Sequence, residues 1–280
     1  MEIITRAARM REISRALRSA GRRLGLVPTM GALHEGHISL VRAAREACDV
    51  VVLSAFVNPI QFGPAEDFER YPRRLAEDAE LAAREGVEFV FAPSPAEMYP
   101  PGYATHVEVE GLSGRMCGAS RPGHFRGVAT VVLKLFEIVS PDLAVFGAKD
   151  YQQAAIIRRM ALDLNLPVEI LVAPTIREAD GLAMSSRNAF LAPQERRAAT
   201  VLRRGLDQAE RLYAAGGRDA AEIESAVRKV LGGEPLARTD YVAVVDAETL
   251  EPAARLAGRT LVAMAVWIGD TRLIDNCVLE

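Results

Sequence analysis

The sequence predicts a doubly wound α/β fold, in which helices cover both faces of a parallel sheet, followed by a smaller α+β domain. Up to about Thr175, short apolar segments alternate with amphipathic helical stretches. The apolar segments are continuous, as in strands buried on both faces. Beyond Thr175 the order changes to helices followed by strands. With 280 residues, of which 50% are hydrophobic, the chain can fill such a core.

The larger part of the chain contains five apolar segments that predict strands. They span residues 24–27, 49–56, 87–91, 143–146 and 168–172, and we expect the first to end where Pro28 interrupts it. The intervening helical patterns cover residues 6–20, 36–47, 73–85, 125–139 and 151–162. Because a helical crossover between strands joins parallel neighbours, the sheet should be parallel.

The C-terminal part has a different rhythm. Helical patterns at 193–215 and 220–231 precede strand patterns at 241–245 and 261–268. We therefore expect a larger domain over residues 1–176 and a smaller α+β domain over residues 177–280.

Composition excludes several classes of function. Charged residues nearly cancel to a net charge of -3, which predicts no general attraction to nucleic acid or anionic membranes, so a bound anion needs a local site. The cysteines Cys48, Cys117 and Cys277 are far apart and form no CxxC pair, so neither a disulfide framework nor a zinc knuckle is indicated. No apolar run approaches the roughly 20 residues of a membrane helix. We expect a soluble cytoplasmic protein.

The loop after the first strand is the first candidate site, since ligands of open α/β sheets bind beyond the carboxyl ends of the strands. His34 and His37 lie three residues apart at a helix N-terminus, where they can donate hydrogen bonds to phosphate oxygens. Gly31 and Gly36 allow close approach of the backbone. The alternatives are a metal-binding HxxH pair, although no further ligand stands nearby, or a purely structural turn.

Two other segments offer positive charge to an anion. The chain contains no GxxxxGK[ST] and no GxGxxG, so the histidine loop must carry phosphate binding. Lys149, one of three lysines against 31 arginines, follows a predicted strand, although a solvated lysine is the alternative. Ser185, Ser186 and Arg187 suit pyrophosphate, although an N-cap with a surface arginine would have the same sequence.

Polar groups after the second strand and before a later helix complete the candidates. The amide of Gln61 can recognise a hydroxyl or a carboxylate, or it can stabilise a turn. The stretch 117–127 contains His124 in a glycine-rich setting and either shapes the site or is a simple loop.

These motifs resemble a known family. The segment His34-Glu35-Gly36-His37 is similar to the HxGH signature of nucleotidylyltransferases, whose Rossmann-like sheet binds ATP. Together with stretches 66–73, 163–167 and 177–182, the motifs resemble the pantothenate synthetase (pantoate–β-alanine ligase) family over nearly the whole chain. Ala148 departs from the family, which usually has glutamate there.

The resemblance implies an ATP-dependent condensation of pantoate with β-alanine that passes through a pantoyl adenylate. It also implies Mg²⁺ bound with the triphosphate rather than by a protein metal site, a homodimer, and no nucleic-acid or membrane partner. The smaller domain would close as a lid over an ATP- and pantoate-binding larger domain.

The resemblance further assigns roles to individual residues. His37, as proton donor, would act with His34, Lys149 and Arg187 in catalysis. Gln61 and Gln153 would bind pantoate, and Gln61 would also bind β-alanine. The residues implied to contact ATP are Met30, Gly31, Ala32, Leu33, His34, Glu35, Gly36, His37, Gly147, Ala148, Lys149, Asp150, Ile176, Met184, Ser185, Ser186 and Arg187.

Two other functions fit parts of the same pattern. One is adenylyl transfer to a phosphorylated acceptor, for which an HxGH segment would look identical. The other is a non-catalytic nucleotide-binding relative, against which the intact His34, His37, Lys149 and Arg187 argue.

Overall fold

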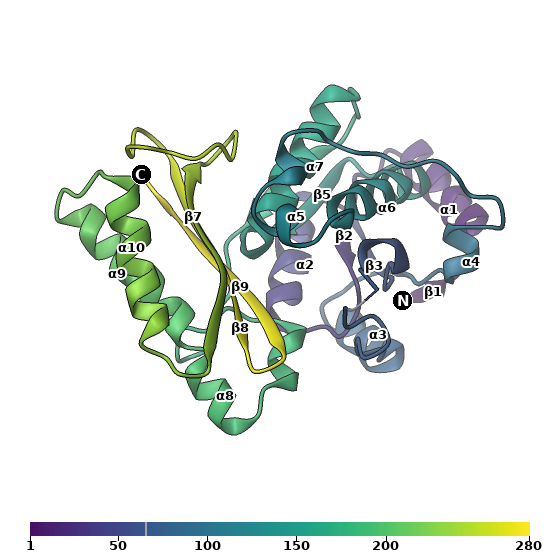
Figure 1. Cartoon of the computed structure of the whole chain (residues 1–280). Coiled ribbons are helices and arrows are strands. Elements are labelled where there is room, and N and C mark those ends of the chain that lie inside the picture. Colours follow the sequence, from purple (N-terminus) through teal and green to yellow (C-terminus); the bar gives the residue numbers. More distant parts are fainter. Residues whose placement is uncertain (65) are drawn as a thin grey trace. The chain divides into compact units, whose positions relative to one another are not determined.

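The computed structural model describes residues 1–64 and 66–280, and the chain divides into two compact units (Figure 1). Unit 1 consists of Met1–Ser113, Arg121–Ala148 and Gln153–Pro174, and unit 2 of Gly114–Ser120, Lys149–Gln152 and Thr175–Glu280. The division into domains at residues 176 and 177 stays a prediction.

Unit 1 is built around a six-stranded sheet in which every pairing is parallel. The strand order is β1-β4-β3-β2-β5-β6. The strands are β1 (Glu2–Ile4), β2 (Leu24–Thr29), β3 (Val50–Ala55), β4 (Phe89–Phe91), β5 (Leu143–Gly147) and β6 (Glu169–Ala173). The doubly wound parallel sheet is therefore confirmed.

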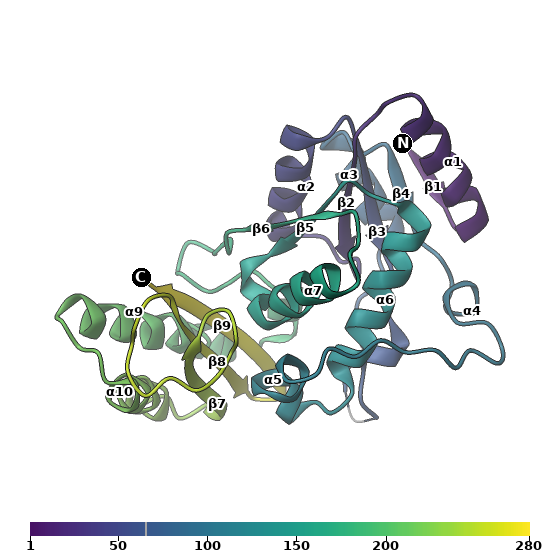
Figure 2. The same cartoon turned by 90° about the horizontal axis from the view of Figure 1, so that it is seen from above.

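Helices cover both faces of this sheet, as right-handed crossovers require. The helices are α1 (Ala7–Ser19), α2 (Glu35–Ala47), α3 (Leu75–Arg84), α4 (Pro95–Met98), α6 (His124–Val139) and α7 (Tyr151–Asp163). The crossovers through α2 and α3 run toward β4, whereas those through α1, α6 and α7 run the opposite way and occupy the other face. Figure 2 shows α2 and α7 on opposite sides of β5. The chain leaves the adjacent strands β2 and β5 in opposite directions, so the switch point of the sheet lies between them.

Two details of the sheet differ from the sequence prediction. The expected break at Pro28 is wrong, because β2 runs through it and Pro28 pairs with Ser54 of β3. The backbone carbonyl of Thr29 points toward β3, so the backbone nitrogen of the preceding residue, Pro28, points toward β5. The pairing of β2 with β5 has already ended at Leu26, so the missing N–H of Pro28 costs no hydrogen bond of the sheet. The short edge strand β1 was not predicted, because its three residues are too few to show a pattern.

Unit 2 combines an antiparallel sheet with a helix pair. Its strands β7 (Ala237–Asp246), β8 (Thr260–Ile268) and β9 (Thr271–Leu279) are ordered β7-β8-β9. Helices α9 (Val201–Ala214) and α10 (Ala220–Gly232) pack on this sheet around a buried apolar cluster that includes Leu202, Val227 and Met264. The predicted α+β character is confirmed, but β9 was not predicted.

The helix predicted over residues 193–215 is two helices, α8 (Pro193–Ala198) and α9. In a continuous helix the carbonyl of Arg197 would accept from the backbone N–H of Val201. It accepts instead from the backbone N–H of Thr200 at 3.3 Å and from the Thr200 hydroxyl at 2.8 Å. This tighter turn ends α8.

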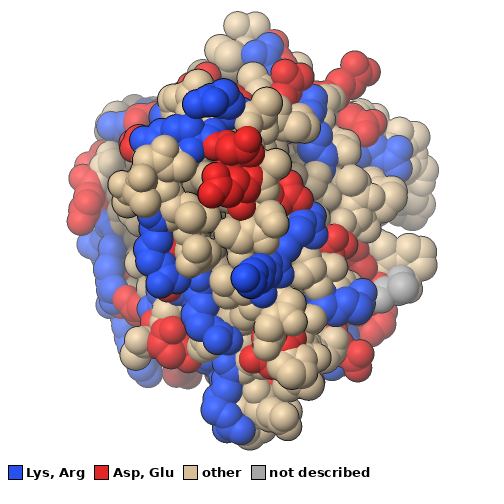
Figure 3. Space-filling view, turned by 60° about the vertical axis from the view of Figure 1, so that its left-hand side comes forward, with Lys and Arg blue, Asp and Glu red and all other residues tan. Residues whose placement is uncertain are grey.

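The surface carries mixed charge. Basic and acidic side chains are interspersed over the face shown in Figure 3. Within the part of the chain that the structure describes, no helix has both the length and the apolar character needed to cross a membrane.

Candidate functional site

The histidine loop follows β2 through a turn with two consecutive left-handed residues. Gly31 has φ 81° and Ala32 has φ 51°, the second of which is unfavourable for a residue with a Cβ. The hydroxyl of Thr29 anchors the start of the turn, since it accepts from the Gly31 backbone N–H at 3.1 Å and donates to the Ser54 carbonyl at 2.6 Å. The loop is thereby fixed to the ends of two neighbouring strands.

A buried carboxylate, Asp78 of α3, holds the middle of this loop. Asp78 is 4% exposed, and its two oxygens accept from the backbone N–H groups of Ala32 at 2.8 Å and Leu33 at 2.7 Å. A Cβ at residue 31 would lie 2.9 Å from Asp78 Oδ2, which explains the glycine there. Sequence reasoning missed Asp78, since it looks like any charged residue of an amphipathic helix.

The two histidines lie at the N-terminus of α2 and contact each other. His34 is the N-cap and its ring centroid is 4.0 Å from that of His37. The His34 backbone N–H donates to His37 Nδ1 at 3.3 Å. Because Nδ1 accepts, the proton of a neutral His37 ring is on Nε2, which makes that atom a hydrogen-bond donor.

Gln61 lies directly beside this loop. It belongs to the 3-10 helix η1 (Pro59–Gln61) after β3, and its side chain is only 8% exposed. Its Nε2 is 3.2 Å from Met30 Sδ, while Asn58 Nδ2 donates to its Oε1 at 2.9 Å. The structure therefore brings a residue predicted to bind ATP into contact with the residue predicted to bind the acid and the amine.

Helix α6 packs closely against η1. A Cβ at Gly127 would lie 2.4 Å from the Ile60 carbonyl oxygen, so only glycine allows this approach. His124 Nδ1 is 2.8 Å from the Gln61 carbonyl oxygen, and Arg121 Nη1 is 3.0 Å from His124 Nε2. His124 thus supports the backbone of Gln61, and a role of this stretch in shaping a site stays a prediction.

Arg121 also forms an ion pair with Glu66 at distances of 2.7 and 2.5 Å. Partial burial of Glu66 opposes its ionisation, but the hydrogen bond and charge of Arg121 outweigh this effect and lower the pKa of Glu66.

The adjacent glutamines at the start of α7 have different surroundings. Gln152 is buried, and its side chain donates to the Arg115 carbonyl at 2.7 Å and accepts from the Cys117 backbone N–H at 3.1 Å. The side chain of Gln153 is half-buried and makes no hydrogen bond to another residue that the structure describes. Of the two amides, Gln153 is therefore the one available to a ligand.

Lys149 is held by strand β9 in unit 2. Its backbone carbonyl accepts from Asn276 Nδ2 at 2.9 Å, and its ammonium lies 3.5 Å from Asp150 Oδ2. Before it, in unit 1, Gly147 ends β5 and Ala148 begins the 3-10 helix η3 (Ala148–Asp150).

The preceding residue of β9, Asp275, holds Arg177, at the start of the turn that leads to Ser185, Ser186 and Arg187. Asp275 is 2% exposed and pairs with Arg177 through two contacts of 2.7 and 2.9 Å. Neighbouring residues of a strand face opposite sides of the sheet, so Asp275 and Asn276 support different segments. Sequence reasoning missed both, because it missed β9.

The segment from Ile176 to Arg187 forms a turn that closes on itself. The Met184 backbone N–H donates to the Ile176 carbonyl at 3.0 Å, so these two predicted ATP contacts lie together. Ser185 Oγ accepts from the Arg187 backbone N–H at 3.3 Å and caps the short helix η4 (Ser186–Phe190). The N-cap alternative for Ser185 is therefore confirmed, although its hydroxyl proton can still be donated elsewhere.

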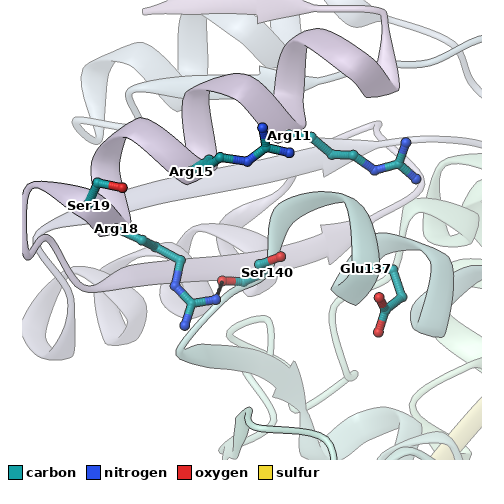
Figure 4. Close-up of a pocket in the computed structure, with 6 residues that line it drawn as sticks. All are labelled: Arg11, Arg15, Arg18, Ser19, Glu137 and Ser140. Atoms are coloured by element: carbon teal, nitrogen blue, oxygen red, sulfur yellow. Dashed lines mark hydrogen bonds between the residues drawn. The ribbon is translucent and has the colours of Figure 1, made fainter.

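The candidate residues thus form two groups, one in each unit. Among residues 1–64 and 66–280, no group of three or more His, Cys, Asp or Glu side chains is arranged to hold a metal ion. A separate hollow of about 430 Å³ in unit 1 is bordered by exposed side chains of α1 and the end of α6, and it contains none of the predicted site residues (Figure 4). Its lining residues are Arg11, Arg15, Arg18, Ser19, Glu137 and Ser140.

Comparison with known proteins agrees along the whole chain. The family model of pantoate-beta-alanine ligase matches residues 2–278. A pantothenate synthetase from Moorella thermoacetica is 60% identical over 280 residues, which cover 100% of this chain and 99% of the relative. A crystal structure of pantothenate synthetase from Thermus thermophilus has a TM-score of 0.94 at 46% identity and covers 99% of both chains. A crystal structure of pantoate-beta-alanine ligase from Francisella tularensis, complexed with beta-gamma ATP and beta-alanine, has a TM-score of 0.83 at 34% identity and covers 99% of this chain and 97% of that one.

Proposed function

This chain belongs to the pantoate-beta-alanine ligase family, and from that premise we propose that it condenses pantoate with β-alanine at the expense of ATP. The products are pantothenate, AMP and pyrophosphate. The observation that supports the proposal beyond family membership is the contact between Gln61 and Met30, which joins the amide predicted to recognise the acid to the loop predicted to bind phosphate.

In the first step a carboxylate oxygen of pantoate attacks the α-phosphorus of ATP, and the bond between that phosphorus and the pyrophosphate oxygen breaks. Negative charge grows on the phosphate oxygens during transfer. His34 and the Nε2–H of His37 stabilise this charge by hydrogen bonding. Since Asp78 occupies the N–H groups of Ala32 and Leu33, the imidazoles carry more of this role than the backbone does.

Side chains from the later segments complete the nucleotide site. Lys149, Ser185, Ser186 and Arg187 supply positive charge and hydroxyl protons to the triphosphate and to the departing pyrophosphate. The remaining predicted ATP contacts lie in the histidine loop, in residues 147–150 and at Ile176 and Met184.

In the second step the amine of β-alanine attacks the acyl carbon of the adenylate. The bond between that carbon and the AMP oxygen breaks, and the amine nitrogen loses a proton. Gln61 and Gln153 hold the pantoyl group, Gln61 also lies beside β-alanine, and the proximity of the reactants supplies most of the acceleration. Residues 177–280 act as a lid that protects the adenylate from water.

Magnesium enters with ATP. Mg²⁺ prefers oxygen ligands and retains several waters, so it is bound through phosphate oxygens rather than by a cage of side chains. We include a homodimer in the proposal on the strength of the family resemblance, and a cytoplasmic location on the strength of the cysteine pattern and the composition of the chain.

Exchange of labelled pyrophosphate into ATP tests the first step. We expect exchange that requires both pantoate and Mg²⁺, is abolished by a chelator, and is weaker with other small hydroxy acids. AMP should appear only when β-alanine is added as well. ATP binding without pantoate-dependent exchange would instead support a non-catalytic nucleotide-binding protein.

The product distinguishes this reaction from adenylyl transfer to a phosphorylated acceptor. That reaction yields a stable dinucleotide and never releases AMP. AMP that forms in proportion to pantothenate therefore supports the ligase, whereas a dinucleotide product contradicts it.

A further inference from the structure

A chain of hydrogen bonds in unit 1 extends from Gln61 to a tyrosine that no motif singled out. Tyr99 follows α4, and its hydroxyl donates to Asn58 Oδ1 at 2.8 Å. Asn58 Nδ2 donates to Gln61 Oε1 at 2.9 Å and to the Gly127 carbonyl at 3.1 Å. Asn58 is 2% exposed, so solvent cannot replace these bonds.

The chemistry of these partners fixes the direction of each amide. The Gly127 carbonyl can only accept, so the NH₂ end of Asn58 must face it. The second proton of that NH₂ group then belongs to Gln61 Oε1, and the Asn58 oxygen is left to accept from Tyr99. The assignment of oxygen and nitrogen therefore follows from a backbone group, whose identity is not ambiguous.

Gln61 consequently presents its NH₂ group at the histidine loop. The neighbour of Nε2 is Met30 Sδ at 3.2 Å, and a thioether is a weak acceptor that a ligand oxygen can displace. A donor in this position attracts a hydroxyl or carboxylate oxygen and disfavours an ammonium group.

Tyr99 is well suited to stay a donor in this chain. Burial and the neighbouring Tyr103 raise the pKa of Tyr99, so its hydroxyl keeps its proton throughout the neutral pH range. The ring is held in place, since its centroid is 5.0 Å from that of Tyr103 and 5.7 Å from Lys134 Nζ.

We infer that Tyr99 is a positioning residue that acts through Asn58 to hold Gln61 as a hydrogen-bond donor, so that this position selects an acceptor oxygen of the hydroxy acid. Gly127 sets the direction of the Asn58 amide and Tyr99 sets its position. The inference rests on the proposed function, which assigns the hydroxy acid to Gln61.

The test compares Tyr99→Phe with Tyr103→Phe as a matched control. Both changes remove one phenolic hydroxyl from the same aromatic cluster, but only Tyr99 bonds to Asn58. We expect Tyr99→Phe to raise the KM for pantoate about fivefold, which corresponds to the loss of one neutral hydrogen bond. The KM for ATP should change less than about twofold. Tyr99→Phe should also reduce discrimination between pantoate and an analogue lacking one hydroxyl, whereas Tyr103→Phe should leave both the KM for pantoate and this discrimination unchanged.

The substitution Asn58→Asp is a second test, because it is expected to reverse the orientation of the Gln61 amide. An ionised aspartate at this position cannot donate, so Gln61 would turn its NH₂ group inward and present Oε1 to the substrate, and the measurement is therefore made at a pH high enough to ionise the buried carboxyl group. We expect a larger rise in the KM for pantoate than in Tyr99→Phe, with thermal unfolding recorded to verify that the variant folds.

The possible failures are distinguishable. A wild-type protein without pantoate-dependent pyrophosphate exchange overturns the proposed function itself. An active wild type with a Tyr99→Phe variant that matches Tyr103→Phe in KM and in discrimination overturns only the role of Tyr99. An equal rise in the KM values for pantoate and ATP would likewise contradict the role of Tyr99, because it would show that the substitution disturbs the whole site rather than the position of Gln61.

Discussion

The substitution Asp78→Asn removes the charge beneath the histidine loop and preserves the shape of the side chain. In the wild type the two carboxylate oxygens accept from the backbone N–H groups of Ala32 and Leu33. Asparagine can accept only one of these bonds, and its NH₂ group faces the other N–H as a second donor. The Asp78 site is 4% exposed, so water cannot easily take the place of the lost acceptor.

The expected cost can be estimated from these contacts. A hydrogen bond to a charged group contributes about 1.5 to 3 kcal/mol, and one such bond is lost while the other is weakened. The loop also contains Ala32 at φ 51°, a conformation that costs roughly 1 to 2 kcal/mol and persists only while it is held. We expect the native loop to lose about 2 to 3 kcal/mol, which corresponds to roughly a thirtyfold or greater loss in kcat/KM for pyrophosphate exchange.

The assay is pyrophosphate exchange together with equilibrium ATP binding and thermal unfolding. Glu77→Gln is the matched control, because Glu77 is the adjacent acid of α3 and pairs, among the residues that the structure describes, with the exposed Arg74 alone, at 3.6 Å. An Asp78→Asn protein that binds ATP and exchanges pyrophosphate within about threefold of Glu77→Gln would show that the carboxylate does not support the loop.

Three other substitutions test separate parts of the site. His37→Ala should lower the pyrophosphate exchange rate by at least about thirtyfold, or ~2 kcal/mol of transition-state stabilisation, and near-normal turnover would contradict the role of the loop. Gly127→Ala should destabilise the fold by about 1 to 3 kcal/mol and raise the KM for pantoate, because its Cβ would meet the Ile60 carbonyl at 2.4 Å; an unchanged melting temperature would contradict this packing. Glu66→Gln should lose stability at neutral pH. Because Arg121 lowers the pKa of Glu66, the wild-type advantage is fully present above the pKa of an unfolded glutamate and disappears as the pH falls through the lower folded value, so an advantage that persists in strong acid would contradict the ion pair.

Several features of this protein could be predicted from local pattern alone. Continuous apolar segments between amphipathic helices indicate a parallel sheet covered on both faces, and the structure has it. The rule that ligands bind beyond the carboxyl ends of strands then selected the loops after β2, β3 and β5. This rule selected His34, Gln61 and Lys149, because each has a side chain that can bind a ligand and lies in the segment that follows an apolar strand.

Other predictions failed where a tertiary contact outweighed a local preference. Pro28 was expected to end its strand, but its missing N–H faces a side where β5 no longer pairs. The helix break at Thr200 depends on the hydrogen bonds of one carbonyl, and a helical periodicity carries no sign of it. Strand β9, with the sequence TRLIDNCVL, has its polar and apolar residues in pairs rather than in alternation, so no period of two marks it as a strand, and its pairing with β8 becomes visible only in the structure.

The doubly wound fold, the family and the chemistry-bearing loops were therefore determined by the sequence by itself, since they depend on periodicity and on residue types at short spacing. The supports of those loops were decided only by the tertiary structure. Asp78 lies 46 residues from Ala32, and Tyr99 lies 41 residues from Asn58. A carboxylate or a phenol acquires such a role only when folding removes the water around it and leaves one backbone or amide group as its hydrogen-bond partner. Because the two partners are far apart in the sequence, no local sequence pattern predicts their contact.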